Sequence, residues 1–308
     1  MYFSFLLYNR NMQVKVYAKL NLTLNVGERQ GEFHSIDSVA TSVDVFDLVE
    51  VTERTDDQVT VKGVDGVEQN CNTAYKAARA FVDAFSTSGV DVSIVKGIPF
   101  GGGLGGSSAD AAAVLYCMSK LKKIDMGWKK TQKMRKNPTH LHKICAALGS
   151  DVTFMLHGGL GRMCGKGDDV ELFEMKRPLY FALTTFAQQM SSREVYAAFD
   201  RLDGHSDKTD NDALLALLQQ GANEQALPYL SNDLQQAAAA ISSYAESYLS
   251  FTKSHNLHAV MTGSGSAYYV AFATRSEAQQ AVDLLSSHGF ATVLCQSVSC
   301  GIQATDKN

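Results

Sequence analysis

Apolar and polar residues alternate most clearly between Val14 and Val26. Every second position in this segment is apolar or small, and polar residues such as Lys19 lie between them. A period of two is typical of a strand with one buried and one solvated face. We therefore expect a half-buried strand here, and two further strands at 39–51 and 59–64.

Helical spacing begins after Asn72, where apolar residues recur every three or four positions and Asn72 itself is a predicted N-cap. A shorter segment with the same apolar spacing, 141–148, predicts a helix that ends at Gly149. The pair Ser150-Asp151 then resembles the cap of another short helix or turn. The basic segment 124–140 between these helices is predicted to be a solvated excursion rather than a binding patch.

The second half of the chain mixes both periodicities with a polar connector at 204–212. The predicted strands are 179–185, 259–261, 268–272 and 291–298, and the predicted helices are 211–220, 231–253 and 276–287. Helices mixed with hairpins favour α+β sandwiches over a doubly wound sheet. A length of 308 residues suits two domains, which we place at 1–160 and 161–308.

Composition narrows the functional classes. The chain is 45% hydrophobic and 19% charged with a net charge of −4, so we expect no nucleic acid and no membrane as a partner. Its six cysteines are scattered without a Cys-x-x-Cys pair, which predicts reduced thiols, a cytoplasmic protein and no structural zinc. Residues 1–11 lack the charge order of a signal peptide and are interpreted as an upstream extension. No stretch is long enough to span a bilayer.

The run from Gly97 to Asp110 reads GIPFGGGLGGSSAD and lies between a strand-like and a helix-like segment. Glycines in this position let backbone N–H groups point at one anion, and the start of a helix adds free donors and a positive dipole end. Ser107 and Ser108 could cap that helix or offer a hydroxyl to phosphate or Mg²⁺. The run therefore predicts a polyphosphate cradle.

Other glycine-loop classes fit this run less well. The sequence lacks the lysine of a Walker-type loop. Gly101, Gly103 and Gly106 satisfy a bare dinucleotide pattern, but a basic stretch replaces the acidic strand end that such a fold needs about 20 residues later. Protein-kinase signatures are also absent. A plain flexible turn is disfavoured because an apolar helix follows directly.

Three more features could carry chemistry. Lys19 and Asn21 share one face of the first strand, where the alternative is ordinary surface exposure. Asp151 could accept a proton from an alcohol, or could simply cap a helix. The segment 261–266, Met-Thr-Gly-Ser-Gly-Ser, fits either an anion-approaching loop or a hairpin turn.

Three segments, taken in their order along the chain, resemble motifs of the GHMP small-molecule kinases. They are the first strand, the glycine loop and the late Gly-Ser-Gly loop. Within that superfamily, five segments look like the 4-diphosphocytidyl-2-C-methyl-D-erythritol kinases of non-mevalonate isoprenoid biosynthesis. These segments are 18–22, Phe33-His34, the helix start at Asn72, 148–152 and 261–265. The resemblance implies a ribosomal protein S5 domain 2-like N-terminal domain and a ferredoxin-like C-terminal domain. It also implies ATP and Mg²⁺ as cofactors, and a cytidine-diphosphate-linked alcohol as substrate for a monomer or weak homodimer.

The same resemblance implies roles for individual residues. Lys19 and Asp151 would be catalytic, Asp151 orienting or deprotonating the substrate hydroxyl and Lys19 steadying the transferring phosphoryl group. The ATP-binding residues would be Pro99, Gly101, Gly102, Gly103, Leu104, Gly105, Gly106, Ser107 and Ser108, with Ser107 or Ser108 near Mg²⁺. The substrate-binding residues would be Asn21, Phe33, His34, Gly263, Ser264 and Gly265, with Phe33 stacking on the cytosine and His34 bonding to its edge.

The chain departs from the family pattern at several positions. Phe33 stands where a tyrosine is usual, Ser107 and Ala109 replace a glycine and a serine of the loop, and Thr153 replaces a proline. Stacking survives the change at Phe33, but a hydroxyl contact is lost. The alternatives are a GHMP kinase of a smaller alcohol such as mevalonate or homoserine, a GHMP-fold decarboxylase, and an ATP-binding homologue without catalysis.

Overall fold

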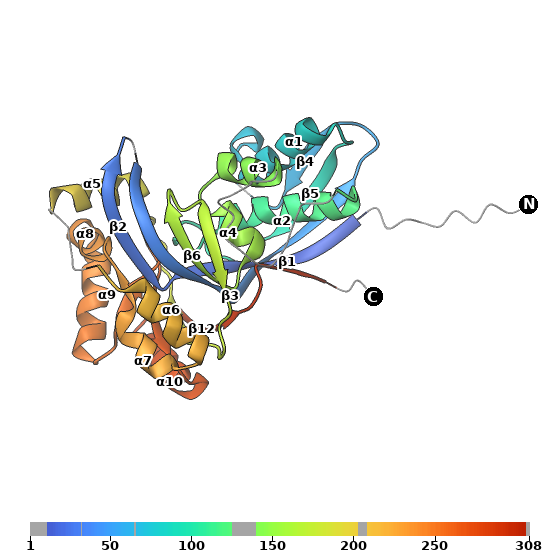
Figure 1. The fold of residues 1–308 in the computed structure, drawn as a ribbon. Coiled ribbons are helices and arrows are strands. Elements are labelled where there is room, and N and C mark those ends of the chain that lie inside the picture. The colour runs from blue at the N-terminus through green and yellow to red at the C-terminus, as the bar shows by residue number, and fades with distance from the viewer. Residues whose placement is uncertain (1–10, 32, 65, 125–139, 203–207, 306–308) are drawn as a thin grey trace, which may run out of the picture.

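The structure is a computed structural model that describes residues 11–31, 33–64, 66–124, 140–202 and 208–305 (Figure 1). The expectations for residues 1–10, for most of the basic segment 124–140 and for the first part of the 204–212 connector lie outside the described residues. Runs of strands and runs of helices follow one another along the described chain, and most strand pairs are antiparallel, so the predicted α+β class is confirmed. The domain boundary after residue 160 stays a prediction.

The strands and helices have the following bounds. The strands are β1 Asn11–Asn21, β2 Thr23–Gln30, β3 Phe33–Glu53, β4 Val59–Lys62, β5 Val90–Val95, β6 Leu160–Gly165, β7 Asp169–Phe173, β8 Tyr180–Thr184, β9 Ser231–Asn232, β10 Ala259–Met261, β11 Tyr268–Phe272, β12 Thr292–Val298 and β13 Ile302–Ala304. The helices are α1 Thr73–Phe85, α2 Gly106–Leu121, α3 His140–Leu148, α4 Val152–His157, α5 Ser192–Arg201, α6 Asn211–Gln220, α7 Asn223–Ala226, α8 Gln235–Ile241, α9 Ser243–Ser254 and α10 Arg275–Ser287.

The 21-residue strand β3 organises the sheet. It pairs antiparallel with β1, β2, β5, β6 and β12, and the main path through the sheet runs β10-β11-β8-β12-β3-β1-β13. Figure 1 shows α1 to α4 grouped beside one part of this sheet, with α6, α7 and α10 at the other end. Strand β13 returns the C-terminal part of the chain to β1, so the two ends of the described sequence share one sheet.

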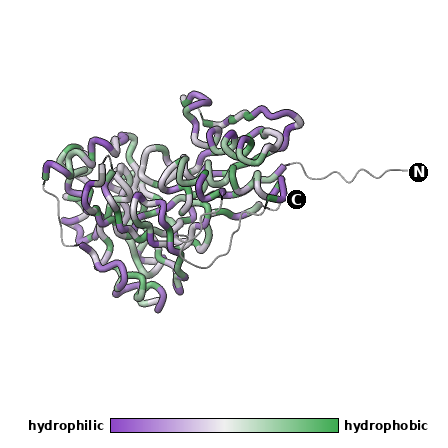
Figure 2. The backbone as a smooth tube through the Cα atoms, turned by 45° about the horizontal axis from the view of Figure 1, so that its top comes forward, coloured by the Kyte–Doolittle hydropathy of each residue, from purple (hydrophilic) through white to green (hydrophobic). Residues whose placement is uncertain are grey.

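Two apolar cores lie against these strands. One surrounds β1, β3, α1 and α2, and the other lies between β8, β10, β11 and the helices α5 and α8 to α10. In Figure 2 the most hydrophilic stretches of the tube follow its outer turns. Helix α2 is buried over most of its length, which fixes its first turn relative to the sheet.

The predicted half-buried strand from Val14 to Val26 was wrong in two respects. A break at Leu22 divides it into β1 and β2. From Tyr17 onward its polar face is also buried, because loops and side chains from later in the sequence cover it: Lys19 is 3% exposed, and the Thr23 hydroxyl donates to Asn211 Oδ1 at 2.6 Å. Periodicity shows that the two faces differ but not that the polar face meets water.

Other element predictions need smaller corrections. The helix expected over 231–253 is interrupted: β9 precedes α8, and Ser242 ends α8 and caps α9 by accepting a hydrogen bond from Ala245 N. Ser107 and Ser108 do not cap α2, because its N-cap is Gly105 and both serines lie inside the first turn. Strands β6, β7 and β13 and helices α5 and α7 were not predicted.

The described residues contain no helix that is both long and apolar enough to cross a membrane. All six cysteines lie within the described ranges, and each is a free thiol there, as the scattered spacing predicted.

Helices α3 and α4 bring two histidines together. The rings of His142 and His157 stack with centroids 6.0 Å apart, and burial lowers the pKa of His157 to about 4, helped by the neighbouring His142. Burial also lowers the pKa of His142. Folding therefore holds both rings in their neutral form at neutral pH.

Acid should consequently weaken the fold through His157. Between pH 6.5 and about 4 the unfolded chain binds a proton that the folded His157 does not, so the free energy of unfolding falls as the pH falls, by up to about 3 kcal/mol. We expect His157→Gln to flatten this part of a denaturation profile measured between pH 4 and 7. The same substitution at the exposed His255 should keep the wild-type slope, and parallel profiles for the two variants would contradict the assignment.

Candidate active site

The glycine-rich loop leads from β5 into α2, as predicted. Gly101, Gly103 and Gly105 have φ angles of 71°, 72° and 75°, which side-chain-bearing residues rarely adopt. A Cβ at Gly103 would also lie 2.3 Å from the carbonyl oxygen of Thr262. Because Gly105 offers no capping side chain, the N–H groups of the first turn of α2 face the loop without a side-chain cap. This is the geometry of an anion cradle.

The late glycine-serine loop packs directly against this cradle. Ser266 N donates to Gly101 O at 3.3 Å, and Ala267 N donates to Gly102 O at 3.2 Å. Asn232 holds the same loop from behind, because its Nδ2 donates to the carbonyls of Met261 and Gly263. The two loops, about 160 residues apart in the sequence, therefore form one continuous backbone surface.

Lys19 lies where the two loops meet. Its backbone N–H donates to Leu104 O of the first loop at 3.0 Å, and its ammonium donates to Asn21 Oδ1. That same amide oxygen accepts from Gly263 N of the second loop at 3.0 Å, while Asn21 Nδ2 donates to Ser38 Oγ at 2.7 Å. The ammonium is thus buried and fixed, which rules out the alternative of a surface lysine.

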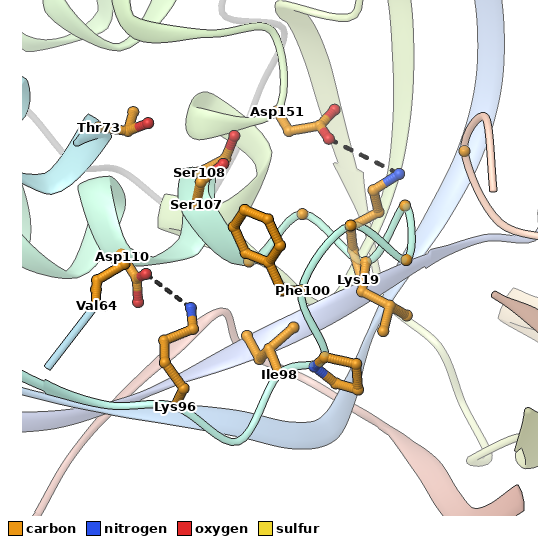
Figure 3. A pocket seen from close by; sticks show the side chains of 18 of the residues that line it. Lys19, Val64, Thr73, Lys96, Ile98, Phe100, Ser107, Ser108, Asp110 and Asp151 are labelled. Carbon is orange, nitrogen blue, oxygen red and sulfur yellow. Dashed lines mark hydrogen bonds and ion pairs between the residues drawn. The ribbon is translucent and has the colours of Figure 1, made fainter. Parts of the chain in front are cut away.

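Asp151 faces Lys19 across a short gap. Asp151 occupies the N-cap position of α4, but its side chain makes no capping hydrogen bond. Its Oδ2 lies 3.8 Å from Lys19 Nζ, and the side chain is 33% exposed (Figure 3). At this separation a ligand oxygen can lie within hydrogen-bond distance of both groups. The structure therefore places the two predicted catalytic residues side by side.

Two cavities meet at this pair. The first has a volume of about 470 Å³ and the second about 850 Å³. The residues that line both are Lys19, Ser108, Asp151, Ser192, Gly263 and Ser264. An arrangement of two cavities that share one lysine and one carboxylate suits the transfer of a group between two ligands.

The first cavity contains every residue predicted to bind ATP. Pro99 and all positions from Gly101 to Ser108 line it, and Ser107 and Ser108 belong to the first turn of α2. The apolar side chains Val64, Val67, Ile98 and Phe100 also line it, together with the charged pair Lys96 and Asp110. Figure 3 shows the Phe100 ring between the Lys19–Asp151 pair and the Lys96–Asp110 pair. A phosphate chain would match the glycine loop, and a flat ring system would match the apolar side chains.

The second cavity contains the predicted substrate residues Asn21, Phe33 and His34. Phe33 is 54% exposed at its rim, with Lys166 Nζ 4.8 Å from the ring centroid. His34 is held more tightly, because its Nε2 is 2.8 Å from Asp200 Oδ1 and its ring stacks on Tyr196 at 5.2 Å. The lining of the cavity thus includes an exposed aromatic ring and an anchored imidazole.

Helix α5 supplies much of this second cavity, and the sequence reasoning missed it. Ser191 followed by Glu194, and the spacing of Val195, Ala198 and Phe199, are signals that could have identified the helix. Burial raises the pKa of Tyr196 to about 12, helped by the negative charge of Asp151, so its phenol stays protonated.

A second charge cluster was also missed, and two of its members, Lys96 and Asp110, line the first cavity. Lys96 Nζ lies 2.5 Å from Asp47 Oδ2 and 2.8 Å from Asp110 Oδ2. The other oxygen of Asp47 accepts hydrogen bonds from Gly97 N and Ile98 N. Burial raises the pKa of Asp110, and Lys96 opposes that shift. The sequence offered no clear signal for Asp47, because its strand also contains Asp37, Asp44, Glu50 and Glu53.

One predicted residue lies away from both cavities. Gly265 is not among their lining residues in the described part of the chain, and a Cβ there would meet Met190 and Met261 instead. Its neighbours Gly263 and Ser264 line both cavities. A role for Gly265 in substrate binding stays a prediction.

Known proteins resemble this chain over most of its length. The family model for the GHMP kinases N terminal domain matches residues 72–159. A 4-diphosphocytidyl-2-C-methyl-D-erythritol kinase of Mycolicibacterium vanbaalenii is 35% identical over 246 residues, which cover 76% of this chain and 73% of the relative. One from Desulfitobacterium hafniense is 30% identical over 280 residues, 87% and 90% of the two chains. A crystal structure of 4-(cytidine 5'-diphospho)-2C-methyl-D-erythritol kinase superposes with a TM-score of 0.75 at 23% identity, covering 93% of this chain and all of that one.

The contact between the two loops can be tested at adjacent glycines. Gly103→Ala would combine a positive φ with a clash against a backbone carbonyl, so the loops must separate. We expect a loss of about a hundredfold in kcat/KM, the size associated with a misplacement of about 1 Å. Gly102→Ala is the matched control, because its Cβ would meet its nearest side-chain atoms at 3.4 Å. Steady-state kinetics that rank the two variants equally would contradict this account.

Proposed function

The chain belongs to the 4-diphosphocytidyl-2-C-methyl-D-erythritol kinase family of the GHMP kinases, and from this premise we infer its reaction. It transfers the γ-phosphoryl group of ATP to the 2-hydroxyl group of 4-diphosphocytidyl-2-C-methyl-D-erythritol. The observation that carries the inference is the meeting of two cavities at Lys19 and Asp151. Each cavity takes one substrate, and the shared residues face the atoms that react.

The gap between Lys19 and Asp151 receives the acceptor hydroxyl. Asp151 accepts its proton as the new oxygen–phosphorus bond forms and the bond to the leaving ADP oxygen breaks. The Lys19 ammonium stabilises the negative charge that spreads over the transferring group. Asn21 holds this ammonium in place, and its bond to Gly263 keeps the second loop in register with it. Phosphoryl transfer asks a protein for this kind of alignment and charge stabilisation.

The first cavity binds ATP. Backbone N–H groups of the glycine loop and the dipole of α2 bind the phosphate chain without a Walker-type lysine. The apolar side chains of Val64 and Phe100 contact the purine ring. Because the phosphate end lies beside Lys19 and Asp151, the terminal phosphoryl group reaches the second cavity.

Mg²⁺ would arrive with the nucleotide. Among the described residues, no group of three or more His, Cys, Asp or Glu side chains could hold a metal ion alone. Magnesium bound to a nucleotide takes several ligands from phosphates and water and needs few from the protein. The hydroxyls of Ser107 and Ser108 at the start of α2 fit that limited role. The ion would supply charge neutralisation at the phosphates.

The second cavity binds the cytidylyl end of the acceptor. Phe33 stacks on the base, a contact of about 1–3 kcal/mol in comparable systems, and His34 hydrogen-bonds to the base edge. Arg29, Lys166 and Arg193 line the same cavity and offset the charge of a diphosphate. A small alcohol such as mevalonate or homoserine needs neither a cavity of this size nor these side chains, so those alternatives are not favoured.

Replacing the base tests the reaction directly. Asp151→Asn keeps the size of the side chain but cannot accept the proton, so kcat should fall by about 10²–10⁴-fold. Binding of Mg-ATP, measured by titration calorimetry, should stay within a few-fold of the wild type. Asp212→Asn is the matched control, since Asp212 pairs with Arg162 and lines neither cavity of the described chain. A nearly wild-type rate for Asp151→Asn would remove the proposed base.

Replacing the rim aromatic tests the acceptor. Phe33→Ala removes the stacking ring but leaves the ATP cavity unchanged, because Phe33 does not line it. We expect the KM of the cytidylyl substrate to rise roughly tenfold or more, with the KM of ATP unchanged. Phe33→Tyr should restore the wild-type value. Equal effects of Phe33→Ala on both substrates would argue against base stacking.

A further inference from the structure

We propose that Asp47 is a positioning residue for the nucleotide, because it fixes the base of the phosphate loop from behind. This inference rests on the proposed function in assigning the first cavity to ATP. Asp47 lies within β3 and is fully buried. It lines neither cavity in the described part of the chain, so it acts on a ligand only through other residues.

The carboxylate of Asp47 holds the entrance of the loop. Oδ1 accepts hydrogen bonds from Gly97 N at 2.7 Å and from Ile98 N at 2.8 Å, and Oδ2 accepts from Lys96 Nζ. Three donors from consecutive residues therefore converge on one buried group. Bonds to a charged acceptor are stronger than those between neutral groups, so this anchor fixes the backbone just before Pro99.

Lys96 extends the anchor to the exit of the loop. Its ammonium also donates to Asp110 Oδ2 at 2.8 Å, and Asp110 belongs to α2 (Figure 3). The ammonium is 3.5 Å from the position that a Cβ at Gly106 would occupy, so it lies against the first turn of that helix. Asp47, Lys96 and Asp110 thus connect β3 to both ends of the loop.

The anchor matters because the loop between its ends is rich in glycine. Such a loop has many accessible conformations, and aligning its N–H groups on a phosphate costs entropy unless the fold has already restricted them. A buried cluster of two carboxylates and one ammonium is weak evidence for stability, since desolvation opposes the attraction between its charges. Its contribution lies in holding the cradle ready for the nucleotide.

The test is Asp47→Asn. The amide oxygen can still accept from Gly97 N and Ile98 N, but the amide NH₂ then faces the Lys96 ammonium. Folding is checked by circular dichroism and thermal unfolding. We expect the Kd of Mg-ATP and the KM of ATP to rise about tenfold, while the KM of the cytidylyl substrate stays within twofold. A general loss of stability would lower the active fraction, and hence kcat, without selecting between the substrates.

The matched control is Asp37→Asn on the same strand. Asp37 accepts two hydrogen bonds from Arg162 at 2.7 Å and lines neither cavity of the described chain. It should leave the Kd of Mg-ATP unchanged. If Asp47→Asn does not fold, Lys96→Met and Lys96→Arg carry the test, because only arginine can still bridge both carboxylates. The expected result is a raised Kd for Lys96→Met and a Kd near the wild type for Lys96→Arg.

Equal shifts of both KM values, or an unchanged Kd for Mg-ATP in folded Asp47→Asn, would overturn the proposal. Where Asp47→Asn does not fold, equal Kd values for the two Lys96 variants would overturn it. Calorimetry measures the Kd of Mg-ATP without turnover, so this test of Asp47 does not depend on which acceptor is phosphorylated. Wild-type protein that binds Mg-ATP but does not phosphorylate the cytidylyl substrate would contradict the acceptor assignment, and the binding measurements would still decide the role of Asp47.

Discussion

The active site depends on one constraint: a buried ammonium must be held where two glycine-rich loops touch. Lys19 is fixed by Asn21, whose amide oxygen also receives a hydrogen bond from Gly263, and it faces Asp151 at 3.8 Å. A buried charge without partners would be costly, so the loops, the amide and the carboxylate stabilise one another's positions. Separating the loops would displace the lysine, the phosphate cradle and the meeting point of the two cavities together.

This constraint explains why glycine is needed at particular positions. The carbonyl of Thr262 approaches Gly103 too closely for any side chain, and the positive φ at Gly103 adds a second reason. The close approach of two backbones keeps the cradle and Lys19 in one rigid unit on β1 and β3. Chemistry that relies on alignment more than on reactive side chains requires this rigidity.

The sequence alone allowed the local motifs to be predicted better than the way they are covered. Residues 97–105, Asn72 and Asp151 were placed correctly on a loop, a helix cap and a helix start, because each has a local signature, whereas 106–110 already belong to α2. The burial of Lys19 was not predictable from alternation, since the residues that cover it come from positions 101–106 and 261–266. Helix α5 had a detectable apolar spacing, but its contacts from Tyr196 and Asp200 to His34 are tertiary and have no local signal.

Each of the two cavities has its own carboxylate behind residues that line it. Asp200 binds His34 beside the second cavity, and Asp47 binds Lys96 and the loop backbone behind the first. The two carboxylates share no hydrogen-bond partner among the described residues, so their effects on the two substrates should be close to additive. Lys19 and Asp151 line both cavities, so changes there affect the transfer step that joins the two ligands. Under the proposed function, recognition of the two substrates therefore depends on different carboxylates, Asp200 and Asp47. The transfer step depends on Lys19 and Asp151, which line both cavities.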